Sequence, residues 1–216
     1  MVRTVLAVWL VLAGLAGPGL AQDRAAAEAA FRTWLTEIIA PRARAEGVSD
    51  AIIDAAFQGV TLDWDLSGLV FPGMPPAPPK HQSQAEFRAP ARYFDPDRMA
   101  GTAAIGRKVA ARLAGTLEAI EKRTGVAGRI LLAIWARESG YGRVAISHNA
   151  FRVLGSRAFA SDGDYLTREL IAALKIAEAG HVPVTEMKSS WAGALGQPQF
   201  MPASFLAYAA DGDGDG

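Results

Sequence analysis

Apolar residues recur along this chain at the three- and four-residue spacing of amphipathic helices. Near the N-terminus this spacing places five apolar residues on one helix face: Phe31, Trp34, Leu35, Ile38 and Ile39. Pro41 follows directly and predicts the end of that helix. The alternation that indicates a pair of strands is scarce. The pattern therefore predicts a mainly α fold.

Further helices follow the same pattern. Ser49 or Asp50 caps a short helix that carries four apolar residues, Ile52, Ile53, Ala56 and Phe57. One long helix is predicted over 97–124, with an inner face of Val109, Leu113, Leu117 and Ile120. Two more helices are predicted over 129–139 and 165–179, and a glycine follows each of these predicted helices. Five prolines between residues 71 and 80 exclude a helix there and predict an extended strap.

The first 21 residues have the pattern of a secretory signal. Arg3 precedes an apolar run over 5–15, which is too short to span a bilayer, and small residues surround Ala21. We expect cleavage before Gln22 and a periplasmic protein without stable membrane insertion. A retained membrane anchor is the alternative. The chain has no cysteine, so it has neither disulfides nor a cysteine that could accept a lipid.

Charge and length narrow the function classes. Lysine plus arginine and aspartate plus glutamate both number 22, so no basic field is expected to attract nucleic acid. The 216 residues, half of them hydrophobic, are enough to bury a core. We expect a monomer with an N-terminal helical segment over 22–66, a proline-rich strap over 67–95 and a main helical core over 96–216.

Glu138 is the first candidate for chemistry. It ends the predicted helix 129–139, four residues after Ile134 and eight after Ile130, so it is expected on the apolar stripe. Burial disfavours the charged form of a carboxyl group, and a general acid needs the protonated form. A structural glutamate paired with Arg137 or Arg143 is the alternative.

Two segments carry a resemblance to a known family. Residues 138–142 read Glu-Ser-Gly-Tyr-Gly, and residues 190–202 read Ser-Trp-Ala-Gly-Ala-Leu-Gly-Gln-Pro-Gln-Phe-Met-Pro. With these segments the chain resembles lytic murein transglycosylases, most closely the membrane-bound lytic transglycosylase B type of the lysozyme-like superfamily. A looser likeness covers 31–60 and 96–159. The resemblance implies a lysozyme-like helical catalytic domain, with the far wall of its cleft beyond residue 216.

The resemblance also implies an activity and a set of site residues. Glu138 would cleave the β-1,4 bond between MurNAc and GlcNAc in peptidoglycan glycan strands and leave 1,6-anhydro-MurNAc ends. No metal or organic cofactor takes part in that step. The expected substrate-binding residues beside Glu138 are Tyr141, Ser190, Gln197 and Gln199. Helix capping by Ser190 and packing of Gln199 are the alternatives.

Two alternatives to a transglycosylase stay open. Glycosidases usually need two carboxylates, but neither segment holds a second one. The nearest acids, Asp162 and Asp164, lie in what reads as an ordinary turn before a helix. A lysozyme-type hydrolase and a non-catalytic peptidoglycan-binding module are the other hypotheses.

The C-terminal residues have the start of a calcium-loop pattern. Asp211, Asp213 and Asp215 alternate with glycines, as loop positions 1, 3 and 5 would. The bidentate acid of position 12 is not in this sequence. We therefore expect a flexible acidic end in the chain as given, and a structural calcium site in a longer form.

Overall fold

The computed structural model describes residues 18–75 and 89–212, and side chains from residue 23 onward. The described residues are mostly helical, which confirms the prediction of a mainly α fold. None of their helices combines the length and hydropathy that crossing a bilayer requires. The expected signal segment up to residue 17 and strap residues 76–88 lie outside the described residues.

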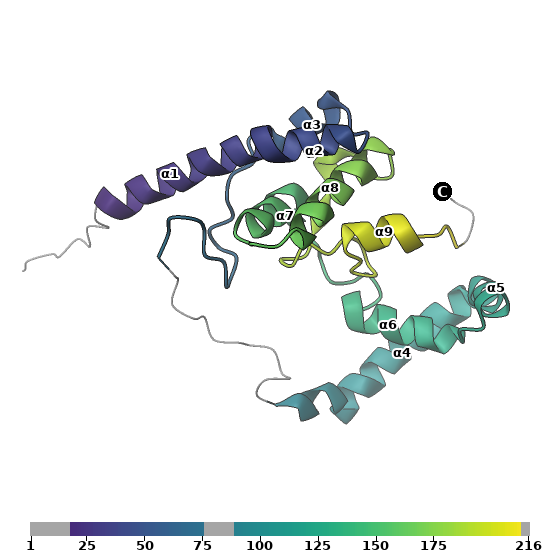
Figure 1. Ribbon diagram of the computed structural model, residues 1–216. Helices are drawn as coiled ribbons and strands as arrows, with labels where there is room; N and C mark the ends of the chain where they lie inside the picture. Colours follow the sequence, from purple (N-terminus) through teal and green to yellow (C-terminus); the bar gives the residue numbers. More distant parts are fainter. Residues whose placement is uncertain (1–17, 76–88, 213–216) are drawn as a thin grey trace, which may run out of the picture.

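The N-terminal helices form one continuous rod (Figure 1). It consists of α1 (Pro18–Trp34), a π-helical turn η1 (Leu35–Ile39) and α2 (Ala40–Ala45). The predicted helix end near Pro41 is therefore wrong. The π turn places Pro41 in the first turn of α2, where a missing N–H donor costs least.

The main core joins these N-terminal helices to the second half of the chain. The rod and α3 (Asp50–Phe57) pack with α7 (Ala150–Phe159) and α8 (Tyr165–Glu178). The largest fully buried side chains of this core come from both halves: Phe31, Ile39, Leu62, Phe151, Leu154, Leu170, Leu174 and Ile176. Packing thus crosses the expected boundary between residues 22–66 and 96–216, and those domain limits stay a prediction.

A hydrogen-bonded contact fixes the start of α3 against the end of α8. The backbone N–H and the hydroxyl of Ser49 both donate to Glu178 Oε2, at 2.9 and 2.7 Å. These bonds hold the pKa of Glu178 below its ordinary value. Ser49 is the N-cap of α3, as expected, but its hydroxyl bonds to α8 instead of capping its own helix.

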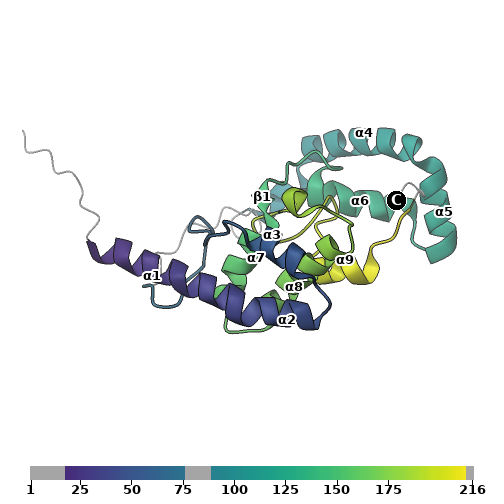
Figure 2. The same cartoon turned by 90° about the horizontal axis from the view of Figure 1, so that it is seen from above.

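Three helices form a separate lobe, which Figures 1 and 2 both show apart from the rod. After a short 3-10 turn η3 (Pro90–Phe94), α4 (Pro96–Arg112), α5 (Ala114–Thr124) and α6 (Gly128–Ser139) pack on one another. The single long helix predicted over 97–124 is thus two helices, broken at Leu113. Gly125 ends α5 in the left-handed conformation, as its position predicted.

A short pair of strands packs beside α7. β1 (His148–Asn149) pairs antiparallel with β2 (Lys188–Ser189), with His148 opposite Ser189. Two residues per strand are too few to leave an alternating pattern, so these strands could not be predicted from the sequence. A 3-10 turn η4 (Val184–Glu186) and helix α9 (Pro202–Tyr208) flank the 190–202 segment, and α7 and α9 were also not predicted.

Glu169 ties α9 to the core, and its loss should weaken the fold. The side chain is buried in α8, and Oε2 accepts a 2.8 Å hydrogen bond from the N–H of Ala203, in the first turn of α9. Glu169→Ala leaves that N–H without its acceptor, so we expect unfolding to need about 1–3 kcal/mol less free energy. Glu169→Gln keeps an acceptor and should lose less. Urea denaturation measures both, and equal losses would contradict this role.

Candidate functional site

Glu138 lies in the last turn of α6, at the place that the sequence predicted. Gly140 ends the helix with φ 59°, and its N–H donates to the carbonyl oxygens of Ala136 and Trp135. The helix predicted over 129–139 is therefore confirmed, with one more residue at its start. The turn beyond it is held by the buried Ser139, whose Oγ accepts a 3.0 Å bond from the N–H of Gly142.

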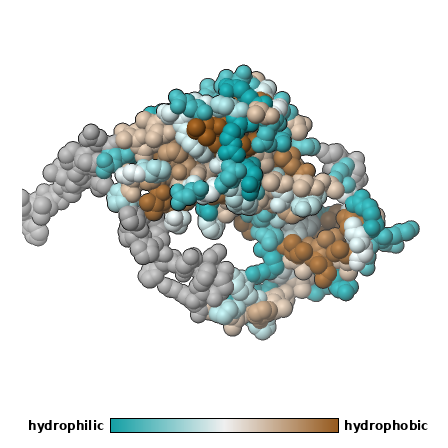
Figure 3. Space-filling view, viewed as in Figure 1, coloured by the Kyte–Doolittle hydropathy of each residue, from teal (hydrophilic) through white to brown (hydrophobic). Residues whose placement is uncertain are grey.

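The expected burial of Glu138 is wrong. Its side chain is exposed, and Ile130 and Ile134 on the same stripe are 47% and 52% exposed. Figure 3 shows a brown, hydrophobic area where Figure 1 places α6. Helix α6 packs on α4 and α5, which leave this stripe uncovered. Periodicity identified the apolar stripe correctly, but it does not say whether another element covers it.

Tyr141 turns back toward α4. Its φ is 61°, and its ring makes an edge contact with Trp135 at 5.7 Å between centroids. Its hydroxyl lies so close to Gly106 that a Cβ on this glycine would be 2.4 Å away. Tyr141 therefore packs between α4 and α6, and its expected contact with substrate stays a prediction.

The second segment folds into a tight loop that uses the hydroxyl oxygen of Ser190. The backbone N–H of Ser190 donates to Ala194 O at 2.8 Å, and Ser190 Oγ accepts from the N–H of Ala194 at 3.3 Å. The loop continues through a bridge between Leu195 and Phe200. Ser190 thus closes a loop and does not cap a helix, which was the alternative that the sequence left open.

Gln199 has an unusual backbone conformation. Its φ is 56°, and its side-chain amide donates to Gly196 O at 2.9 Å. Within residues 18–75 and 89–212, Tyr141 and Gln199 are the two non-glycine residues with positive φ, one in each segment. Such conformations cost free energy and concentrate at functional sites. The residue types of Tyr141 and Gln199 did not signal this strain.

Gln197 joins the two segments. Trp135 Nε1 donates a 3.0 Å hydrogen bond to Gln197 Oε1. The same amide packs on the backbone of Gly142, where an added Cβ would lie 2.3 Å from Oε1. The structure therefore brings the end of α6 and the 190–202 loop together at this side chain. Trp135 could not be assigned to the site from its residue type, because a tryptophan on a helix usually belongs to a core.

Asp164 is engaged elsewhere. It forms ion pairs with Arg42 at 2.8 Å and with Arg168 at 3.4 Å, at the start of α8. The hydrogen bond from Arg42 holds the pKa of Asp164 below its ordinary value. A carboxylate stabilised in its charged form in this way is unsuited to donate a proton.

The acidic C-terminal residues are only partly described. Asp211 is exposed, while Asp213 and Asp215 lie outside the described residues. Gly212 lies beside α5, where a Cβ would be 3.8 Å from Ile120 Cδ1. Within 18–75 and 89–212 no three His, Cys, Asp or Glu side chains form a group that could hold a metal.

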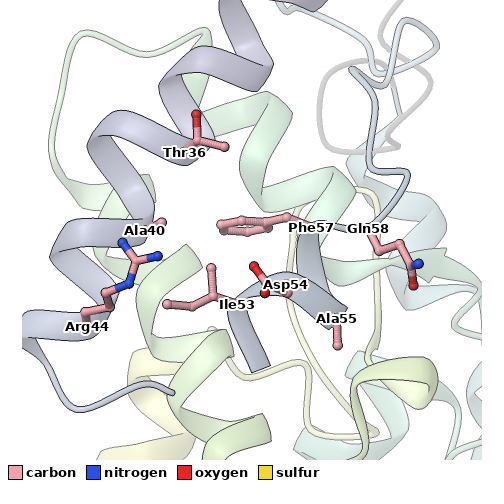
Figure 4. A pocket seen from close by; sticks show the side chains of 8 residues that line it. All are labelled: Thr36, Ala40, Arg44, Ile53, Asp54, Ala55, Phe57 and Gln58. Carbon is pink, nitrogen blue, oxygen red and sulfur yellow. The ribbon is translucent and has the colours of Figure 1, made fainter. Parts of the chain in front are cut away.

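Neither of two pockets found among the described residues is lined by Glu138. One of about 460 Å³ lies between the rod and α3, where Phe57 and Ile53 point toward the helix that carries Ala40 (Figure 4). Its Arg44 is already paired with Asp50. The other, of about 290 Å³, lies beside the turn after α6 and is lined by Thr102, Ile105, Ala136, Gly140, Tyr141, Arg143 and Val144.

Comparisons with known proteins agree with this arrangement. Residues 30–216 match the family model of the transglycosylase SLT domain. Membrane-bound lytic murein transglycosylase B of Escherichia coli (strain K12) is 34% identical over 94 residues, which are 43% of this chain and 26% of that protein.

Solved structures are similar as well. SltB3 from Pseudomonas aeruginosa, in complex with NAG-anhNAM-pentapeptide, superposes with a TM-score of 0.69 and 30% identity. That match covers 86% of this chain and 47% of SltB3. Escherichia coli Slt35 in complex with calcium has a TM-score of 0.51 and 28% identity, covering 61% of this chain and 42% of Slt35.

The chain therefore spans about half of the length of SltB3 and about a quarter of transglycosylase B. The family match, in contrast, covers most of the residues, and it includes both segments around Glu138 and Ser190. With its helical architecture and these similarities, this chain belongs to the family of transglycosylase SLT domains, whose fold is lysozyme-like.

Proposed function

We propose that this chain carries the catalytic acid of a lytic transglycosylase that cleaves the MurNAc–GlcNAc β-1,4 bond of peptidoglycan. One observation carries the proposal: an exposed Glu138 ends α6, and the Trp135–Gln197 hydrogen bond holds that end against the 190–202 loop. The similarity to SltB3, which has been solved with NAG-NAM-pentapeptide and NAG-anhNAM-pentapeptide, supports the same substrate class.

The proposed reaction needs one carboxyl group. Glu138 gives its proton to the glycosidic oxygen, the C1–O bond of MurNAc breaks, and GlcNAc leaves with a free hydroxyl. The 2-acetamido group of MurNAc stabilises the cationic C1. The Glu138 carboxylate then takes the proton of the 6-hydroxyl, whose oxygen bonds to C1 and closes the 1,6-anhydro ring. No water is consumed, and Glu138 ends in its protonated form.

The remaining site residues are assigned to binding. Ser190 and Gln199 lie in the loop opposite the end of α6, where backbone and amide groups are available for hydroxyl and acetamido groups of the glycan. Gln197 and Tyr141 contact Trp135 beside the turn after Glu138, and we assign them to substrate binding as well. The ion pairs of Asp164 support a mechanism with one carboxylate.

The mass of the products tests the proposal against its two alternatives. Purified peptidoglycan is incubated with the chain, and the released muropeptides are analysed by mass spectrometry. A transglycosylase releases 1,6-anhydro products, which are one water lighter than the reducing ends that a lysozyme-type hydrolase releases. Sedimentation with peptidoglycan but no released product identifies a binding module and contradicts catalysis by this chain.

We also propose that the protein works in the periplasm as a monomer. The signal pattern of residues 1–21 supports export, and the proposed substrate lies outside the cytoplasm. N-terminal sequencing of periplasmic protein is expected to begin at or near Gln22. Recovery of intact Met1 in the membrane fraction would contradict cleavage.

Calcium should bind weakly to the 216-residue chain. Three alternating aspartates supply too few oxygen ligands for the six to eight that Ca²⁺ takes, and their charges repel one another. We expect a dissociation constant no lower than about 1 mM. A longer form with an acid at loop position 12 should bind more tightly and melt at a higher temperature with calcium. Calorimetry on both forms measures this, and micromolar binding by the short chain would contradict the prediction.

A further inference from the structure

Arg157 is an unusual cation beside the second segment. It lies near the end of α7, and its guanidinium carbon is 5.6 Å from the ring centroid of Trp191. The residue is half-buried, and its Nε is buried without a hydrogen-bond partner. Burial lowers the pKa of Arg157 below its ordinary value. Among the described residues no carboxylate forms an ion pair with it.

The other arginine on α7, Arg152, also has a buried Nε without a hydrogen-bond partner, but its Nη2 finds acceptors in the fold. Arg152 donates to the carbonyl oxygen of Leu62 at 3.1 Å, and its guanidinium lies 3.6 Å from Asp63. Arg152 therefore has acceptors within the fold, and Arg157 has none among the described residues. A half-buried cation without an acceptor loses hydration that nothing in the protein replaces.

Trp191 is the exposed neighbour of this cation. Its side chain is 51% exposed, although it directly follows Ser190 in the tight loop. The loop packs closely on α7, because Gly193 lies against the buried Leu154 at a distance that excludes a Cβ. The exposed ring of Trp191 in the loop and the guanidinium of Arg157 on α7 thus lie side by side.

We propose that Arg157 and Trp191 form a carboxylate-binding subsite for the glycan strand. A carboxylate on Arg157 would make charge-assisted hydrogen bonds, which offset the lost hydration, while the sugar that carries it lies on the Trp191 face. The subsite rests on the proposed function, because peptidoglycan supplies both parts. Its carboxylate is either the free lactyl group of MurNAc or a carboxylate of the stem peptide.

The position of Arg157 assigns it to binding and not to bond cleavage. It is eight residues beyond Asn149 at the start of α7, about 12 Å along the helix axis. Glu138 lies in the last turn of α6, which precedes β1 and α7 in the chain. Arg157 therefore sets which strands bind, and a change there should alter affinity.

Binding of three short ligands to the full chain tests this subsite. NAG-NAM carries the lactyl carboxylate, NAG-NAM-pentapeptide carries carboxylates on the peptide, and NAG-NAG is neutral. None contains the MurNAc–GlcNAc bond, so none is cleaved. Calorimetry measures the dissociation constants, and nuclear magnetic resonance follows the Nε–H signal of Arg157. We expect Arg157→Gln to weaken binding of at least one acidic ligand about tenfold and to leave NAG-NAG unchanged.

The three ligands also separate the two sources of the carboxylate. Weaker binding of NAG-NAM alone identifies the lactyl group, and weaker binding of the pentapeptide ligand alone identifies the peptide. Arg123→Gln removes the same charge from the exposed end of α5 and is the matched control. If Arg157→Gln does not fold, nuclear magnetic resonance on the unaltered chain still tests the subsite. Only the acidic ligands should then shift the Arg157 Nε–H signal.

Failure of the subsite is distinct from failure of the function. Three results would overturn the subsite alone. They are unchanged affinities in Arg157→Gln, an equal loss of affinity in Arg123→Gln, and an Arg157 Nε–H signal that moves equally with NAG-NAG. Absence of binding of all three ligands to the unaltered chain would contradict the proposed function together with the subsite.

Discussion

Replacing Glu138 with glutamine is expected to lower turnover of peptidoglycan by at least about 10³-fold. General acid–base catalysis alone contributes about 10²- to 10⁴-fold, and here one carboxyl group serves in both steps. Glutamine has the same shape but neither gives nor takes the proton. Because the side chain is exposed, the exchange should leave thermal stability and glycan binding nearly unchanged.

Release of muropeptides, measured with time, is the readout for this variant. Glu118→Gln is the matched control, since Glu118 is also exposed and lies on α5, away from both segments. The control should keep the activity of the unaltered chain. Near-normal release by Glu138→Gln would show that another group is the acid.

Gly193→Ala should have the largest effect on stability. Gly193 has φ 96°, and a Cβ there would lie 2.4 Å from Cδ2 of the fully buried Leu154. A left-handed alanine costs about 1–2 kcal/mol, and overpacking a core costs about 1–3 kcal/mol more. We expect a loss of about 2–5 kcal/mol and, because the Ser190 loop is displaced from α7, a loss of activity.

Gly196→Ala separates the cost of the left-handed backbone from the cost of the clash with Leu154. Gly196 also has a left-handed φ, of 61°, but its nearest neighbour would be Pro198 Cδ at an ordinary 3.5 Å. That variant should lose only the backbone contribution. Leu154→Ala opens space under the loop, so the double variant with Gly193→Ala should lose less than the sum of the single losses. Equal denaturation midpoints for the two glycine variants would contradict the clash.

Local sequence rules predicted much of the site. The position of Glu138 at the end of a helix and the glycine that ends it follow from residue types and spacing. The family followed from the resemblance of both segments to known motifs. These features depend on residues that are close together in the sequence, so they can be predicted without knowing the fold. The same holds for Gly125 at the end of α5.

Features that depend on distant residues could not be predicted. Whether Ile130 and Ile134 are covered depends on which helices pack on α6. Pro41 lies in the first turn of a helix that follows a π turn, and the bond between Trp135 and Gln197 spans 62 positions. In each case a tertiary contact or a rare local geometry overrides a sound local rule.

The lobe of α4 to α6 holds few buried side chains, and this affects the motions of the proposed acid. Buried positions in these helices are Gly106, Val109, Gly128 and Ser139, whereas α8 is buried along most of its length. A unit with little buried apolar surface opens locally at a lower free energy than the whole molecule. Amide protons of α6 should therefore exchange with solvent before those of α8, and Glu138 lies on the part of the molecule that adapts most readily to an arriving strand.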